Sequence, residues 1–140
     1  MTDSLEEFKE DFALIIEAGF IAVRQLDEKS ARALFLAAQS LNPQSTASKL
    51  GLGYIALTKM ETEKAAPLFE EICQSEADNT LAKIFLGICY FISRKKISEG
   101  KKMIQEAIEQ SEEATIQDLG KQALKWADKD YAKQAKAPFF

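Results

Sequence analysis

The chain of 140 residues has room for one domain, and its contents of 46% hydrophobic and 29% charged residues are ordinary for a globular protein. Six glycines and three prolines are too few for the turns of an all-β fold. The absence of histidine excludes serine–histidine and cysteine–histidine catalysis as well as zinc sites that use histidine, and a net charge of −4 disfavours general nucleic-acid binding.

Three features of the sequence bear on the cellular compartment. Cys73 and Cys89 lie singly inside apolar segments, which is typical of buried, reduced thiols in a reducing compartment. The acidic stretch 1–7 does not look like a secretory or transit signal. The nearly apolar run 84–92 is less than half as long as a membrane span. We therefore expect a cytoplasmic protein with no membrane insertion.

Apolar residues recur at steps of three and four along almost the whole chain, which predicts helices and no strands. Ser4 and Glu7 form a capping box at the start of the first helix. Residues 27–30 separate it from a second helix, which should stop before Pro43. We expect Ser45 to cap the third helix and Glu61-Thr62 to lead into the fourth, in which Pro67 causes a slight kink or a late start. The fifth helix should begin at Asn79 or Thr80. The turn 94–96 should precede the sixth helix, and the seventh should begin at Thr115.

The sequence repeats itself with a period of 34 residues. A small-residue pair recurs in three helices, an alanine and a phenylalanine follow in the next helix, and a proline closes the first unit. In the third unit the second helix is shifted by one residue, which indicates one extra residue in the turn 94–96. The matching positions are Ala18-Gly19, Leu52-Gly53 and Leu86-Gly87; Ala31 and Ala65; Phe35 and Phe69; and, at an offset of 35, Gly100, Ile104 and Ala107 against Ala65, Phe69 and Ile72.

This pattern resembles the tetratricopeptide repeat over residues 12–112. The resemblance implies an all-α fold of about seven helices, a right-handed solenoid in a single domain over residues 1–140. It implies that Gly19, Gly53 and Gly87 let the two helices of each hairpin approach closely, while Phe35 and Phe69 fill the space to the next hairpin. The expected parts are three hairpins at about 12–45, 46–79 and 80–114, a capping helix at about 113–134 and a tail at 135–140.

Two local patterns suggest chemistry, and we interpret both as structural. The segment 51–56 reads G-x-G-x-x-A, but a dinucleotide loop needs a buried strand before it, and the 34-residue period already explains Gly53. The carboxylate pairs Glu70-Glu71 and Glu112-Glu113 fall on helix surfaces or ends, where solvation is their ordinary role. We therefore expect no enzyme activity, no cofactor and no metal site.

The resemblance also implies a binding face, because the first helix of each hairpin in this family lines a concave groove. The matching positions here are almost all apolar, which favours an amphipathic helix or an extended apolar segment as the partner. Some members of the family bind an acidic peptide end with a carboxylate clamp of lysine and asparagine. Ile16 and Phe20 stand at the positions where that clamp would begin, so we do not expect this class of ligand. The residues expected to line the groove are Ile16, Phe20, Val23, Leu50, Tyr54, Leu57, Leu81, Ile84, Ile88 and Phe91.

A small acidic protein of this kind resembles the tetratricopeptide-type chaperones of type III secretion. The short chain favours the class that holds the needle subunit and prevents its premature assembly, often with a second small co-chaperone. A translocator chaperone and a general scaffold or adaptor are the alternatives. Several coverings of the groove stay open: the N-terminal residues Leu5 and Phe8, the tail 138–140, or a homodimer. The lysines at 121, 125, 129 and 133 form either a solvated helix face or a docking strip for an acidic partner.

Overall fold

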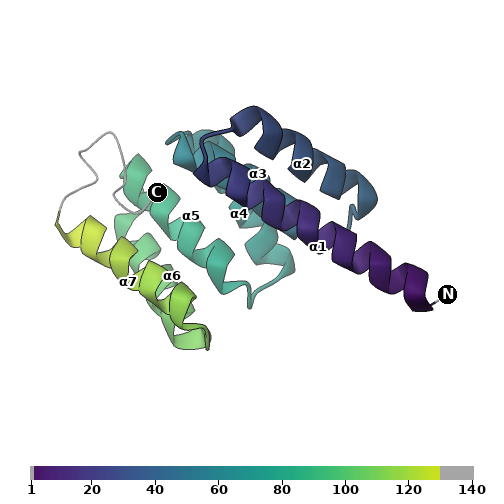
Figure 1. Cartoon of the computed structure of the whole chain (residues 1–140). Coiled ribbons are helices and arrows are strands. Elements are labelled where there is room, and N and C mark those ends of the chain that lie inside the picture. Colours follow the sequence, from purple (N-terminus) through teal and green to yellow (C-terminus); the bar gives the residue numbers. More distant parts are fainter. Residues whose placement is uncertain (1, 130–140) are drawn as a thin grey trace. The chain divides into compact units, whose positions relative to one another are not determined.

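The computed structural model describes the backbone of residues 2–129 and the side chains of residues 7–129. Within that part, the chain forms seven α-helices and no strands (Figure 1), so the all-α prediction is confirmed. No helix among the described residues has the length and apolar character that crossing a membrane would need. The helices are α1 (Thr2–Arg24), α2 (Glu28–Leu41), α3 (Ala47–Thr58), α4 (Thr62–Ser75), α5 (Thr80–Ser93), α6 (Ile97–Gln110) and α7 (Ala114–Asp128).

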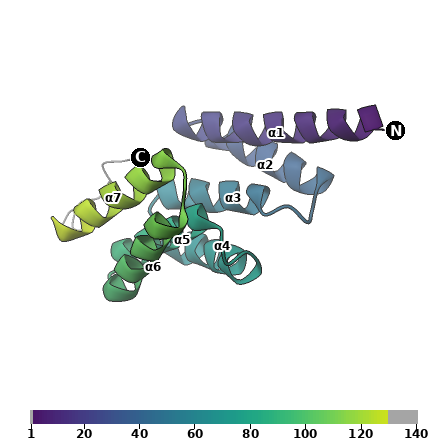
Figure 2. The same cartoon turned by 90° about the horizontal axis from the view of Figure 1, so that it is seen from below.

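The chain divides inside α3, between Ile55 and Ala56, into two compact units. In the first unit α1 packs along α2, as Figures 1 and 2 both show. In the second unit α5 packs against α4, α6 and α7, and α6 also packs against α7. The solenoid handedness and the single domain over residues 1–140 stay predictions.

The turn inside each hairpin shows the repeat directly. Leu26, Met60 and Arg94 are spaced by 34 residues, and each has a φ of 61°, in the left-handed region. Each of the three donates its backbone N–H to the carbonyl three residues earlier, at 2.9–3.2 Å. The next helix begins two residues after Leu26 and Met60 but three residues after Arg94. The predicted extra residue in the turn 94–96 is therefore confirmed.

The second helix of each hairpin buries the same three positions, four and three residues apart. Because these spacings bring the side chains to one face of a helix, the triads mark the side that packs inward. The triad of α6 lies 35 residues after that of α4, which is the expected one-residue shift of the third unit. The buried triads are Ala31, Phe35 and Ala38 in α2; Ala65, Phe69 and Ile72 in α4; and Gly100, Ile104 and Ala107 in α6.

Most predicted helix boundaries agree with the structure, and the exceptions are small. The side chains of Ser45 and Asn79 accept backbone N–H groups at the starts of α3 and α5, as expected. The helix α1 begins at Thr2, so the prediction that it starts at Ser4 is wrong. The helix α7 begins one residue before Thr115.

Two further boundary predictions concern Pro67 and the end of the chain. The helix α4 starts at Thr62 and contains Pro67, so the proline does not delay its start. The last turn of the expected capping helix (residues 130–134) and the tail 135–140 lie outside the described residues.

Phe35 fills the closest approach in the first unit. Its ring is fully buried, and a Cβ added to Gly19 in α1 would lie 2.6 Å from it. A Cβ on Gly51 in α3 would lie 2.3 Å from the same ring. The expected role of Gly19 is thus confirmed, and Phe35 reaches the next hairpin at Gly51. The sequence pattern had not given Gly51 a packing role.

In the third hairpin, α5 and α6 also approach closely at glycine, but with different residues. A Cβ on Gly87 would lie 2.6 Å from the Ile104 side chain. A Cβ on Gly100 would lie 2.9 Å from the carbonyl oxygen of Gly87. Because α5 and α6 approach this closely, glycine stands at position 100, where the other two units have alanine. The departure from the repeat pattern is therefore a consequence of packing.

We predict that Gly51→Ala destabilises the protein although alanine is the better helix former by about 1 kcal/mol. The added methyl group overlaps the Phe35 ring, so the free energy of unfolding in urea should fall by about 1–3 kcal/mol. The double variant with Phe35→Leu is the control, because the smaller side chain makes room. An equal loss in that background would contradict the assigned contact.

We predict the opposite sign for Leu26→Gly. Leu26 is 90% exposed and so loses little packing, while glycine adopts its positive φ without the steric cost that leucine carries. The free energy of unfolding should rise by about 0.5–1 kcal/mol. The matched control is Leu36→Gly, at an exposed position inside α2, which should lower it by about 1 kcal/mol. A loss of stability in Leu26→Gly would show that the turn is not strained.

Candidate functional site

An aromatic cluster forms the centre of the first unit. The Phe20 ring lies 5.0 Å from that of Phe35 at an interplanar angle of 71°, an edge-to-face contact. Phe20 also contacts Tyr54 in α3, with 5.6 Å between the two ring centres. Both distances are in the range of favourable aromatic pairs. The cluster therefore ties α1, α2 and the first part of α3 together.

The edge of this cluster is not fully covered. Phe35 is buried, whereas Ile16, Phe20 and Tyr54 are each half-buried. Partial burial raises the pKa of the Tyr54 hydroxyl, and the positive charge of Arg24 nearby opposes that rise. The hydroxyl is therefore neutral at physiological pH, and the ring presents an apolar face with one polar atom. We call the surface formed by Ile16, Phe20 and Tyr54 the aromatic face.

Half of the ten predicted groove residues do not have the expected exposure. Ile16, Phe20, Leu50, Tyr54 and Leu81 are half-buried, as a binding surface requires. Val23 is only 7% exposed, and Leu57, Ile84, Ile88 and Phe91 are at most 1% exposed, so these five belong to the core. The prediction that they line an open groove is wrong. Since the ten residues belong to both units, a groove shared by all of them stays a prediction.

The burial of α5 explains the error. In the second unit α5 is contacted by α4, α6 and α7, so it has neighbours on most of its circumference. Eight of its residues are buried, including Phe85 and Cys89, which are not among the predicted groove residues. Apolar residues lie on most sides of α5, which is typical of a helix at the centre of a core. The family positions picked out an apolar helix face and could not show that another helix covers it.

A second surface feature was not found from the sequence. Leu14 and Ile21 lie seven residues apart on α1 and are 62% and 40% exposed. That spacing brings them to one side of the helix, away from the Phe35 contact at Gly19. They provide exposed apolar positions on the same helix that do not belong to the aromatic face.

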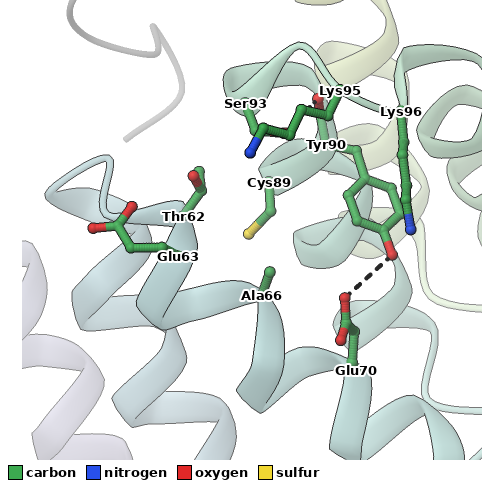
Figure 3. Close-up of a pocket in the computed structure, with 9 residues that line it drawn as sticks. All are labelled: Thr62, Glu63, Ala66, Glu70, Cys89, Tyr90, Ser93, Lys95 and Lys96. Atoms are coloured by element: carbon green, nitrogen blue, oxygen red, sulfur yellow. Dashed lines mark hydrogen bonds between the residues drawn. The ribbon is translucent and has the colours of Figure 1, made fainter.

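The second unit contains a cleft of about 410 Å³ between α4, α5 and the turn after α5. This volume is in the range of ligand pockets. Figure 3 shows the Cys89 sulfur and the Ala66 methyl group pointing into it, with Lys95 passing across one side. The remaining lining residues are Thr62, Glu63, Glu70, Tyr90, Ser93 and Lys96.

Tyr90 joins the two walls of this cleft. Its hydroxyl donates to Oε1 of Glu70 on α4 at 3.5 Å, and the Lys96 ammonium lies 5.3 Å from the ring centre. Burial, with the charge of Glu70 as the next cause, raises the pKa of Tyr90 to about 12. The hydroxyl therefore keeps its proton at physiological pH and can only donate to the carboxylate.

The cleft has no activated nucleophile among its lining residues. Burial, with the charge of the Glu70 carboxylate as the next cause, raises the pKa of the Cys89 thiol to about 12. A thiol that stays protonated is neither a nucleophile nor a good metal ligand. The described residues also contain no group of histidine, cysteine and carboxylate side chains that could hold a metal ion. The cleft therefore has the size of a ligand pocket, and its one lining thiol is protonated.

Comparison with known proteins adds nothing to this picture: no family model, no curated protein and no solved structure matches the chain. The argument about function therefore depends on the chain's own residues.

We predict that only one thiol reacts in the folded protein with 5,5′-dithiobis-(2-nitrobenzoate) at pH 8. Cys73 is half-buried, whereas Cys89 is buried and its raised pKa lowers the thiolate fraction roughly a thousandfold. Urea should release the second thiol. In Cys73→Ser the fast phase should disappear, and fast labelling of Cys89 in that variant would contradict its burial.

Proposed function

We propose that this chain is a protein-binding module that acts as a chaperone, and that its aromatic face holds the apolar side of an amphipathic helix from a client protein. The observation that carries the proposal is the half-exposure of Ile16, Phe20 and Tyr54 around a fully buried Phe35. A core needs Phe35 to be covered. It does not need two aromatic rings left partly in water beside it.

Rings of this kind suit protein recognition for a physical reason. A half-buried aromatic side chain is already held by its neighbours, so little conformational entropy is lost when a partner covers the rest of it. Phe20 is fixed by Phe35 on one contact and by Tyr54 on the other. Aromatic residues are also the ones that most often dominate binding energy. A client helix would place its apolar residues on this face.

The resemblance of the sequence to type III secretion chaperones supplies the finer part of the proposal. The client is then the needle subunit, whose own assembly surface is covered in the cytoplasm until export, with a second small co-chaperone as a further partner. No catalytic step is involved. A translocator subunit as client is the alternative within the same mechanism.

A scaffold or adaptor is the alternative outside this mechanism. It is favoured by three lysines in and directly after α7, because Lys121, Lys125 and Lys129 are all exposed and lie four residues apart. Such a strip suits an acidic partner. The two functions use different surfaces, so substitutions can separate them.

We predict that Tyr54→Ser and Ile16→Ser weaken capture of the client roughly 30-fold, the effect of removing an interface hot spot. The measurement is co-expression with the candidate needle subunit, affinity purification and titration of the purified pair. Leu14→Ser and Ile21→Ser are matched controls on α1 and should leave the affinity unchanged. Circular dichroism must show equal helix content in all four variants.

Three outcomes would contradict the proposed function or its finer assignment. If the Leu14 and Ile21 variants lose the client while Tyr54→Ser keeps it, the aromatic face is not the binding surface. If binding is lost only in Lys125→Glu and Lys129→Glu, the adaptor function is favoured. A co-purified protein that does not polymerise on its own would argue against the needle-chaperone assignment.

A further inference from the structure

Arg24 lies at one end of the aromatic face. It follows Phe20 by four residues and Ile16 by eight, and these spacings bring the three side chains to neighbouring positions on one side of α1. The positive charge of Arg24 is close enough to act on the hydroxyl of Tyr54 in α3. A cation therefore borders the apolar surface that we propose for the client helix.

The guanidinium of Arg24 is available to a partner. Among the described residues, no carboxylate pairs with it, and its side chain is exposed. The other arginine of the first unit, Arg32, pairs with Glu28 at 3.0 Å. A cation in the last turn of a helix is favoured by the helix dipole, but that role leaves its N–H donors to bind something else. A guanidinium suits a carboxylate in particular, because two parallel hydrogen bonds can join them.

Glu17 adds a negative charge two turns earlier on α1. It is exposed, and it precedes Arg24 by seven residues, about 10.5 Å along the helix. A carboxylate on a bound helix would be attracted beside Arg24 and repelled beside Glu17. The two charges therefore favour one register of a client helix along Ile16 and Phe20, with its acidic residue at the Arg24 end.

We propose that Arg24 pairs with an aspartate or glutamate of the client, placed one helical turn beyond the client's apolar residues. The inference rests on the proposed function, because it concerns the same aromatic face. The partner is then an amphipathic helix with apolar residues at steps of three and four and a carboxylate at one end of that stripe. The rings supply most of the binding, and the ion pair selects the register and the client.

The test is a titration of the full-length protein with synthetic helical peptides, followed by fluorescence anisotropy. Each peptide has about 20 residues, which is long enough for an isolated alanine-rich helix, and carries a stripe of leucines at steps of three and four. Both ends are blocked, so no terminal charge takes part. One residue, a turn before or a turn after the leucines, is glutamate, glutamine or lysine.

Four variants are compared with the wild-type protein. Arg24→Gln removes the charge and Arg24→Glu reverses it. Lys29→Glu is the matched control, because it makes the same change of charge at an exposed position of α2, outside the aromatic face. Tyr54→Ser shows whether a peptide binds to the aromatic face at all. Circular dichroism must show equal helix content in every variant.

We expect the wild-type protein to bind the glutamate peptide about fivefold more tightly than the glutamine peptide, and the lysine peptide most weakly, in one of the two placements. Arg24→Gln should abolish the difference and Arg24→Glu should reverse the order, while Lys29→Glu keeps it. Salt at about 0.5 M should reduce the difference, because it screens the pair.

Two sets of outcomes would overturn the inference, and they differ in what they say about the proposed function. If binding depends on Tyr54 but the three peptides bind equally in both placements, or if Lys29→Glu changes their order as Arg24→Glu does, the role of Arg24 is wrong and the aromatic face remains a binding surface. If no peptide shows binding that depends on Tyr54, the face does not hold amphipathic helices, and both proposals fail.

Discussion

The close approach of helices at glycine is the constraint on which the structure depends. In the first unit Gly19 and Gly51 leave the space that the Phe35 ring fills. The second unit uses Gly87 for the Ile104 side chain in the same way. Because a ring or a branched side chain packs directly on backbone, the α1–α2 and α5–α6 hairpins have little freedom to slide. The half-exposed Phe20 contacts the Phe35 ring directly and Tyr54 contacts Phe20, so the proposed binding face is built on this packing.

Much of the fold could be predicted because its signals are local. The apolar period, the caps at Asn79 and Ser45, and the 34-residue repeat all act within one or two helices. Even the extra residue in the third turn was visible in the sequence. Gly51 was not, because its role depends on a ring 16 residues earlier in the chain that reaches it only after α2 has packed.

The candidate site could be predicted only in part, since exposure depends on which helices come together. Ile16, Phe20 and Tyr54 are partly exposed as expected, whereas Ile84 and Ile88 are enclosed by helices of the second unit. The same apolar spacing describes both groups. The cleft that contains Cys89 and Tyr90 combines residues from two helices and a turn, and no spacing within one helix could have indicated it.

The left-handed residue in each hairpin turn has a consequence for how such a chain can change. Leu26, Met60 and Arg94 close the first helix in the same way, and the third copy then holds one more residue before its second helix starts. The buried triad of α6 still faces inward. Turn length and core alignment are thus uncoupled at this point. Copies of an ancestral hairpin could gain or lose residues there and diverge on the surface while their interiors continued to match.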